Sequence, residues 1–303
     1  MKLLASRRFP GPAWAELGDV EYAEDGLASS PPRDDVDVLV VVGERVDDEV
    51  LDRFPRARLV ANYGVGYDAL DVGACARRGV AVTNTPGVLS AATADLTLAL
   101  VLAVRRRLVE GDRLVREGRW GQGWSGGYLI GDEVTGLTLG IVGYGRIGRE
   151  VRRRARGFDM RVLVASRSRV ADDHVEQLEL DELVAAADVV TLHVPLTDET
   201  RGLIGAPELA SMRDGAALVN TARGAVVDEP ALVRELVSGR LRAGLDVFAH
   251  EPEVPRELLS LPNVVLAPHV GSATRETREA MTRVLVDNVL AFAAGRAPPN
   301  RVA

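Results

Sequence analysis

The chain has 303 residues, which predicts two domains at roughly 150 residues per domain. Its hydrophobic content of 47% and charged content of 27% are typical of a soluble globular protein with sizeable buried cores. The net charge of −7 disfavours a general nucleic-acid binder, because no basic excess is available to neutralise phosphates.

Cysteine usage and hydropathy indicate a cytoplasmic location. Cys75 is the single cysteine, so no intrachain disulfide can form, which fits a reducing compartment. The apolar run at the N-terminus is too short for a signal peptide. The most apolar window, residues 91–107, contains Asp95 and ends in three arginines, which favours a buried helix over a membrane span.

The first part of the chain alternates between strand and helix patterns. Apolar, β-branched runs at 36–42, 57–61 and 79–83 predict strands, and the patch "DDEVLDRF" between the first two predicts a helix. Such alternation is typical of a parallel sheet with right-handed crossovers. One long helix is expected over about 91–117.

Residues 118–131, "GRWGQGWSGGYLIG", form a loop that mixes flexible backbone with large apolar side chains. The segment holds six glycines together with Trp120 and Trp124. The two tryptophans either pack against their own domain or belong to an arm that covers a cleft or a partner subunit.

From residue 137 the strand–helix alternation restarts with the rhythm of a doubly wound nucleotide-binding domain. A final amphipathic helix is expected over about 274–295, ending at "GRAPP". The expected strands are 138–142, 161–165, 188–194, 216–220, 243–247 and 263–267.

Gly143, Gly145 and Gly148 form a G-x-G-x-x-G pattern between an expected strand and an expected helix. In a dinucleotide-binding turn the first glycine permits the tight turn, and the second lets a pyrophosphate approach the backbone. The third lets the helix and strand pack closely, and the helix N-terminus then holds the phosphates. This context favours a dinucleotide site over a purely structural glycine turn.

An acidic residue that holds the ribose 2′-OH of NAD is expected about 20 residues further on, after the second strand. This chain has Ser166, Arg167 and Ser168 there, followed by Arg169. A guanidinium and two hydroxyls suit a 2′-phosphate, which a carboxylate would repel. We therefore expect NADP to be preferred over NAD, the alternative being that these are solvated loop residues without a preference.

Arg223, Glu251 and His269 each lie in a short stretch just past an expected strand, at the sheet edge where ligands bind in such folds. Reduction of a carbonyl by hydride requires a proton donor, and histidine changes protonation near neutral pH. A neighbouring carboxylate stabilises the imidazolium, and an arginine can bind the carboxylate of a 2-keto acid and polarise its carbonyl. Taken singly each residue could be structural, but together they indicate an active site.

From about residue 58 to its end, the chain resembles the family of D-isomer-specific 2-hydroxyacid dehydrogenases. Several independent motifs in the order of the family carry this resemblance. They are "NYGVGYDALD" (62–71), "VTNTPGVLSAATADLT" (82–97), "GIVGYGRIG" (140–148), "LHVPLTDETRGLI" (192–204), "LVNTARGAVVDE" (218–229), "LDVFAHEP" (245–252) and "PHVGSAT" (268–274).

The resemblance implies roles for individual residues. It identifies Arg223, Glu251 and His269 as the catalytic set, and the amides of Val65 and Gly66 as the substrate-carboxylate loop. It further implies a homodimer in which Trp124, on the glycine-rich arm, shapes the neighbouring pocket. The residues that it implies for cofactor binding are Thr93, Gly143, Gly145, Arg146, Ile147, Gly148, Val194, Pro195, Thr221, Ala222, Asp246 and His269, in addition to Ser166, Arg167 and Ser168.

The expected architecture is a doubly wound Rossmann cofactor domain, 99–280, inserted in a smaller flavodoxin-like α/β substrate domain, 1–98 plus 281–303. The expected function is reduction of a small 2-keto acid with NAD(P)H, and the strongest resemblance is to glyoxylate/hydroxypyruvate reductases. No metal, nucleic acid or membrane partner is expected. Phosphoglycerate dehydrogenases, phosphite dehydrogenases and a non-catalytic nucleotide-sensing protein are the alternatives.

Overall fold

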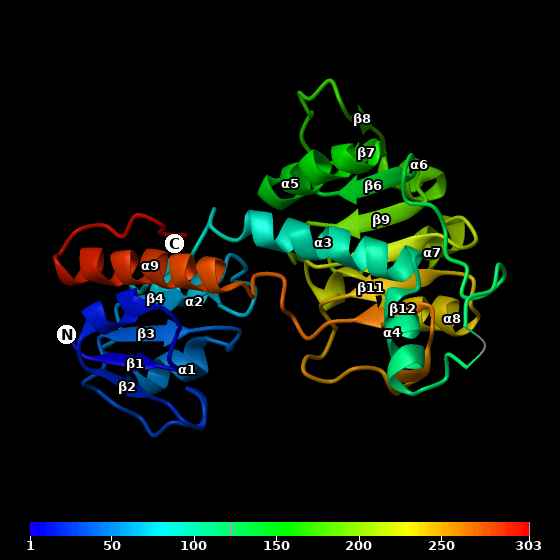
Figure 1. The fold of residues 1–303 in the computed structure, drawn as a ribbon. Helices are drawn as coiled ribbons and strands as arrows, with labels where there is room; N and C mark the ends of the chain where they lie inside the picture. Colours follow the sequence, from blue (N-terminus) through cyan, green and yellow to red (C-terminus); the bar gives the residue numbers. More distant parts are fainter. Residues whose placement is uncertain (122, 303) are drawn as a thin grey trace. The chain divides into compact units, whose positions relative to one another are not determined.

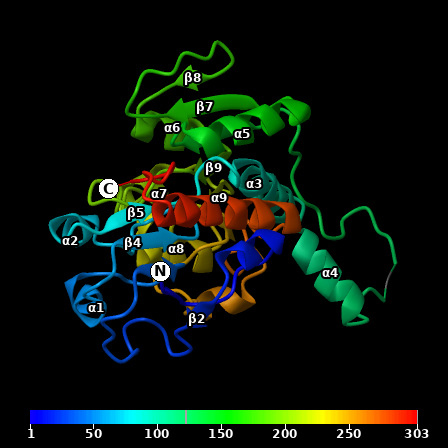
Figure 2. The ribbon, with the colours of Figure 1, turned by 90° about the vertical axis from the view of Figure 1, so that its left-hand side faces the viewer.

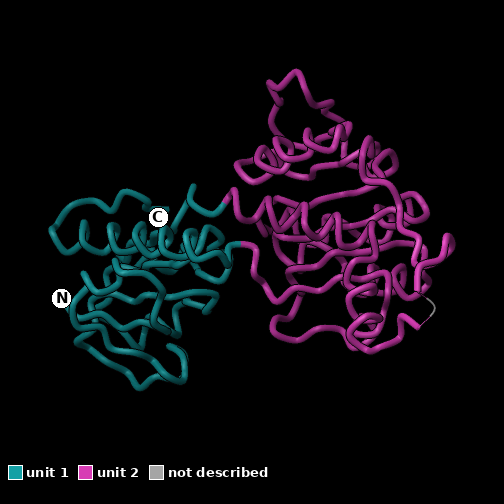
Figure 3. The backbone as a smooth tube through the Cα atoms, in the orientation of Figure 1, with its two compact units in different colours: residues 1–89, 272–303 teal, residues 90–271 magenta. Residues whose placement is uncertain are grey.

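The computed structural model describes residues 1–121 and 123–302, so one residue of the expected 118–131 loop lies outside the described residues. The chain forms two compact units (Figure 3): residues 1–89 with 272–303 are unit 1, and residues 90–271 are unit 2. The sequence places the boundaries later, at 98/99 and 280/281. Those positions fall inside two continuous helices, α3 (Ser90–Arg105) and α9 (Arg275–Ala293), whereas the units divide before each helix begins.

Unit 1 is built on a five-stranded parallel sheet with the order β2-β1-β3-β4-β5 (Figure 1), which is the flavodoxin-like strand order. The expected flavodoxin-like domain is therefore confirmed. β3 and β4 are buried along their whole length, as the apolar runs indicate for strands covered on both faces. The strands are β1 (Leu3–Ala5), β2 (Val20–Tyr22), β3 (Val38–Val41), β4 (Leu59–Asn62) and β5 (Ala81–Thr83).

Helices cover this sheet from both sides. The core that contains Phe54 packs α1 (Asp48–Arg53) and α2 (Val72–Arg77) against the sheet. η1 (Pro12–Leu17) packs against α9, which also contacts β4. Tyr63 stacks on Phe9 with ring centroids 4.2 Å apart, and its hydroxyl donates to the Arg278 carbonyl at 2.8 Å.

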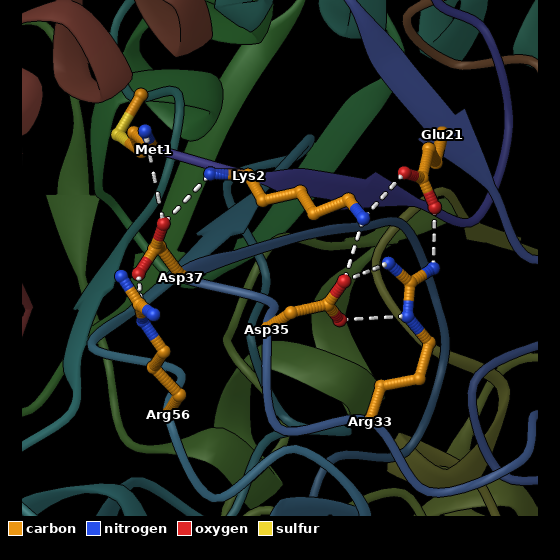
Figure 4. A network of polar contacts seen from close by, with 7 residues as sticks. All are labelled: Met1, Lys2, Glu21, Arg33, Asp35, Asp37 and Arg56. Carbon is orange, nitrogen blue, oxygen red and sulfur yellow. Dashed lines mark hydrogen bonds and ion pairs between the residues drawn. The ribbon is translucent and has the colours of Figure 1, made fainter.

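The sequence analysis did not predict β1 and β2, which are only three residues long. An ion-pair network of unit 1 includes residues at or beside these strands (Figure 4). Lys2, which is next to β1, pairs with Asp35 at 2.5 Å, and Arg33 pairs with Glu21 of β2 at 2.5 Å. The hydrogen bond from Arg33, followed by that from Lys2, lowers the pKa of Glu21.

Unit 2 is built on a seven-stranded parallel sheet with the order β12-β11-β10-β9-β6-β7-β8. Taken in the order in which the chain forms them, these strands follow the doubly wound Rossmann arrangement with one further strand. The expected Rossmann domain is confirmed. The strands are β6 (Thr138–Val142), β7 (Arg161–Ala165), β8 (Glu176–Gln177), β9 (Val189–Leu192), β10 (Ala217–Asn220), β11 (Arg242–Leu245) and β12 (Val264–Leu266).

Two hydrophobic cores, one on each face, hold this sheet between its helices. One core packs α3 and α5 against the strands, and the other packs α6, α7 and α8 (Figure 1). The helices not yet given are α4 (Leu108–Arg116), α5 (Arg146–Ala155), η2 (Arg156–Phe158), α6 (Leu180–Ala186), α7 (Ala206–Ser211), η3 (Gly224–Val226), α8 (Glu229–Val237) and η4 (Arg256–Ser260).

The single helix expected over 91–117 is wrong, because the chain breaks it into α3 and α4. Arg107 adopts a left-handed backbone with φ of 52°, and its guanidinium bonds Glu110 at 2.8 Å in the first turn of α4. The Arg105 carbonyl instead accepts the amide of Asp132 at 2.9 Å. No residue of α4 is buried, and Figure 2 shows this helix projecting from the rest of unit 2.

The most apolar part of the chain forms much of α3, where Leu100 and Val101 are buried in unit 2. This burial explains the apolar window that the sequence shows there. Within residues 1–121 and 123–302, no helix has the length and apolar character that a membrane crossing requires.

Candidate active site

The strand order of unit 2 reverses between β6 and β9, and ligands of doubly wound sheets bind at the carboxyl edge of such a point. Gly143 follows β6 and has φ of +95°. A Cβ there would lie 2.7 Å from the carbonyl carbon of His193 and 2.9 Å from Val194 Cγ1. Only glycine allows the two chain segments to approach so closely. Val194 and the exposed Pro195, both expected at the cofactor site, therefore lie beside the glycine turn.

The glycine turn has the features that a pyrophosphate requires. Gly145 is the N-cap of α5, has no side-chain capping bond, and has no atom within 4 Å of a Cβ placed on it. A Cβ at Gly148 would lie 2.3 Å from the Gly143 carbonyl oxygen, so this glycine permits the close helix–strand packing. Arg146 is exposed in the first turn, whereas Ile147 packs against the core of unit 2. The amides of this helix start thus remain accessible to an anion.

His193 is a half-buried histidine beside this turn. Both ring nitrogens are buried and have no hydrogen-bond partner among the described residues. Desolvation by burial lowers the pKa of His193 to about 3, so the imidazole is neutral at ordinary pH. His193 therefore lacks the ready proton of an imidazolium, and no catalytic role is assigned to it.

The residues expected to select the cofactor follow β7. Ser166 is half-buried, and Arg167 and Ser168 are exposed. The hydrogen bond from Thr197 makes the largest contribution to lowering the pKa of Glu199, and the charge of Arg167 contributes in the same direction. Arg167 therefore lies near the loop that follows β9, at the same edge of the sheet as the glycine turn.

The loop that carries Arg223 is held by a buried amide side chain. Asn220 Nδ2 donates to the Arg223 carbonyl at 2.8 Å, and its Oδ1 accepts from the Ala222 amide at 3.0 Å. The Arg223 guanidinium donates to the Ala222 carbonyl at 2.8 Å. Asn220 is 1% exposed, so the loop shape is fixed from inside the sheet edge.

Gly224 brings the Arg223 loop against the loop that follows β11. A Cβ at this position would lie 1.9 Å from the carbonyl carbon of Phe248 and 2.3 Å from the Ala249 nitrogen. These distances exclude any side chain at Gly224. The Ala249 amide also donates to Glu229 Oε1 of α8 at 3.0 Å, which holds the second loop in place.

Glu251 and His269 form a hydrogen-bonded pair with 2.6 Å between Oε2 and Nδ1. The other carboxylate oxygen, Oε1, accepts from the Phe248 amide at 3.1 Å. Desolvation raises the pKa of Glu251, but the hydrogen bond and charge of His269, the Phe248 amide and the Arg223 charge together lower it. The His269 side chain is 49% exposed and that of Glu251 33% exposed, and the pairing on Nδ1 leaves Nε2 for a substrate.

Asp246 holds the backbone that carries His269. Its carboxylate accepts the amides of Val270 and Gly271 at 2.7 and 2.8 Å, and its carbonyl accepts the His269 amide at 2.8 Å. His269 has φ of 54°, a left-handed conformation that costs about 1–3 kcal/mol in a residue with a side chain. The three hydrogen bonds to Asp246 maintain this strained conformation.

Thr93 and Thr221 lie at the same edge of the sheet. A Cβ on Gly271 would lie 3.5 Å from Thr93 Cγ2. Thr97 Oγ1 donates to the Thr93 carbonyl at 2.8 Å and lies 3.0 Å from the buried Thr221 Oγ1. The first turns of α3 therefore lie over the carboxyl ends of β10 and β11.

Val65 and Gly66 follow β4 in unit 1. Asn62 Nδ2 donates to the Gly66 carbonyl at 2.8 Å, and Asn84 Nδ2 donates to the Val65 carbonyl at 3.0 Å. In the part of the chain that the structure describes, the backbone amides of Val65 and Gly66 donate no hydrogen bond. The loop thus keeps two donors available while its carbonyls are occupied.

Trp124 does not pack against its own domain. Its side chain is 87% exposed, and Trp120 is 53% exposed with its indole N–H donated to the Gly123 carbonyl at 3.1 Å. The structure therefore does not show the first expected alternative for Trp124, which was packing against its own domain.

Cys75 is a buried free thiol. Burial raises the pKa of the Cys75 thiol to about 11, and His250 is exposed beside the Glu251 loop. Residues 1–121 and 123–302 contain no group of three or more His, Cys, Asp or Glu side chains placed to hold a metal ion.

Comparison with known proteins identifies the family. Residues 98–271 match the D-isomer specific 2-hydroxyacid dehydrogenase, NAD binding domain. A glyoxylate reductase from Thermococcus litoralis is 47% identical over 300 residues, covering 94% of this chain and 90% of its own. The crystal structure of an NADPH-dependent glyoxylate/hydroxypyruvate reductase from Sinorhizobium meliloti, in complex with NADP and malonate, aligns with a TM-score of 0.91 at 34% identity, covering 100% of this chain and 96% of that chain.

The chain belongs to the D-isomer specific 2-hydroxyacid dehydrogenase family. It is an NAD(P)-dependent oxidoreductase, which confirms the expected enzyme class. The open backbone at Gly145, the uncapped start of α5 and the close approach at Gly143 fit a dinucleotide in unit 2.

The sequence analysis missed the residues that hold the site in shape. Asn220 and Gly224 fix the Arg223 loop, while Asn62 and Asn84 orient the Val65–Gly66 loop. Each of these residues stands inside a quoted motif, and an asparagine at the end of an apolar strand was the available signal for Asn62, Asn84 and Asn220.

Proposed function

We propose that the protein reduces a small 2-keto acid of the glyoxylate or hydroxypyruvate type to the D-2-hydroxy acid, with NADPH preferred over NADH. The observation that carries the proposal is the Glu251–His269 pair at 2.6 Å, with the charge of Arg223 acting on the same carboxylate. Relatives from Thermococcus litoralis and Pyrococcus furiosus, 47% and 50% identical to this chain, are glyoxylate reductases.

The proposed chemistry assigns one role to each residue. Arg223 binds the substrate carboxylate and polarises the adjacent carbonyl. His269 delivers a proton from Nε2 to the carbonyl oxygen, and Glu251 stabilises the imidazolium through Nδ1. The amides of the Val65–Gly66 loop are further donors for the carboxylate. The bound nicotinamide supplies the hydride that reduces the carbonyl carbon.

The cofactor roles expected from the sequence are proposed for the same edge of unit 2. The amides at Gly145, Arg146 and Ile147 bind the pyrophosphate at the start of α5. Ser166, Arg167 and Ser168 bind the ribose 2′-phosphate. The remaining residues, which line the adenosine and nicotinamide halves, are Thr93, Gly143, Gly148, Val194, Pro195, Thr221, Ala222, Asp246 and His269.

We also propose a cytoplasmic homodimer in which α4 and the following arm pack on the second copy. Exposed apolar side chains along this segment support it: Leu108, Val115, Trp120, Trp124 and Ile130. Within this proposal, Trp124 contributes to the substrate pocket of the partner subunit.

Changing Val115 and Ile130 to aspartate is expected to shift the protein from twice the 32.5-kDa chain mass to the chain mass in sedimentation. The double change of Val237 and Leu259, which are also exposed but lie outside this segment, is the control and should leave the mass unchanged. A wild-type protein that sediments as a single chain would contradict the proposed dimer.

A panel of glyoxylate, hydroxypyruvate, pyruvate and bulkier keto acids, each with NADPH and NADH, tests the proposed reaction. We expect a higher kcat/KM with NADPH than with NADH. Arg167→Ala should lower the ratio of kcat/KM with NADPH to kcat/KM with NADH by about tenfold or more, because a charge-assisted phosphate contact is lost. Arg161→Ala is the control, since Arg161 stands at the opposite end of β7 and pairs with Glu176. A wild-type preference for NADH would overturn the cofactor assignment, and nucleotide binding without turnover of any keto acid would favour a sensor.

His269→Ala should lower kcat by about 10²–10⁴-fold, because the proton donor is lost, while the Kd for NADPH stays within about threefold. Stopped-flow turnover and fluorescence titration measure the two quantities. His250→Ala is the matched control, because His250 is exposed next to Glu251 and should retain normal turnover. Near-normal rates in His269→Ala would remove His269 from the mechanism.

A further inference from the structure

One side chain, Gln177 of β8, fixes the shape of the segment that carries Ser166, Arg167 and Ser168. Its Nε2 donates to the carbonyls of Ser166 and Ser168 at 2.9 and 3.1 Å. Its Oε1 accepts from the Val170 amide at 2.9 Å. The Gln177 amide group therefore forms three hydrogen bonds with the backbone, one before Arg167 and two after it.

Gln177 is itself held by the sheet. It pairs in register with Val164 of β7, and the next residue, Leu178, donates its amide to the Val164 carbonyl at 3.0 Å. The Gln177 side chain that binds the segment thus belongs to a strand that is hydrogen-bonded to β7, and the segment follows β7 directly. Because the carbonyls at 166 and 168 are both fixed, so is the direction in which the Arg167 side chain leaves the backbone.

A second anchor, Asp172, holds the chain just after this segment against the glycine turn. The Asp172 carboxylate accepts from the Tyr144 hydroxyl at 2.6 Å and from Arg152 Nη2 at 3.2 Å. Tyr144 stands between Gly143 and Gly145, so this contact ties the segment to the proposed phosphate-binding turn. Neither anchor uses the side chain of Arg167, Ser166 or Ser168.

We propose that Gln177 is a positioning residue for cofactor selection, which holds Arg167 and the two serines in the conformation that binds the 2′-phosphate of NADPH. The inference rests on the proposed NADPH preference. A guanidinium binds a phosphate in a bidentate manner only in a defined orientation, and a segment that is already ordered loses less entropy on binding. Without Gln177 the segment keeps its charge but loses its fixed shape.

Gln177 can be tested separately from the phosphate-binding turn. Tyr144 is buried and belongs to the turn itself, so its replacement would disturb the binding of every nucleotide. Gln177 is exposed and belongs to none of the hydrophobic cores of unit 2. Its removal is therefore expected to change the segment and leave the fold intact, which thermal unfolding checks.

The test is calorimetric titration of the full chain with 2′,5′-ADP and with 5′-AMP, two probes that differ in the 2′-phosphate and require no turnover. For Gln177→Ala we expect the affinity for 2′,5′-ADP to fall about fivefold to tenfold, with the affinity for 5′-AMP within about twofold of wild type. The NADPH-to-NADH ratio of kcat/KM should fall by a similar factor. Loss of a merely structural contact would weaken both probes equally.

Glu176→Ala is the matched control. Glu176 is the other residue of β8, is also exposed and pairs with Arg161, away from the 166–170 segment. Its loss should leave both affinities unchanged. An unchanged preference for 2′,5′-ADP over 5′-AMP in Gln177→Ala, or an equal loss of affinity for both probes, would overturn the role of Gln177. Wild-type protein that binds the two probes equally would instead overturn the proposed cofactor preference.

Discussion

The close contact between Gly224 and the backbone of Phe248 and Ala249 is the constraint on which the site of unit 2 depends. A single methyl group at Gly224 would overlap atoms that cannot move aside, because they belong to the chain and not to a flexible side chain. The contact places the Arg223 loop against the loop that leads to Glu251. It also accounts for the influence of the Arg223 charge on the Glu251 carboxylate.

Buried polar side chains hold the backbone around the proposed catalytic residues. Asn220 shapes the loop before Gly224, and Asp246 holds the backbone around His269 in a strained conformation. Strain of this kind persists only where neighbouring bonds enforce it, and it is concentrated at functional sites. A rigid support therefore holds the exposed imidazole, as its proposed role of proton donor requires.

The sequence was sufficient to predict the fold class, the family and most strands of the Rossmann domain, because buried parallel strands are continuous apolar runs with glycine turns at their ends. The break between α3 and α4 was missed, since it depends on the left-handed Arg107 and on a tertiary bond to the Arg105 carbonyl. β1 and β2 were too short to show a period. The supporting role of Gln177 depends on contacts that residue type and spacing do not encode.

The Glu251–His269 pair is the most direct test of this account, and carboxyl-carbon NMR can titrate Glu251 itself. In the wild-type chain the pKa of Glu251 should lie below its ordinary value, because desolvation of the carboxylate is outweighed by the imidazole together with the Phe248 amide and the Arg223 charge. In His269→Ala, desolvation loses its main opposing interaction, and the pKa of Glu251 should rise. An unchanged pKa of Glu251 in that variant would show that the two side chains do not act as a pair in solution, contradicting the account.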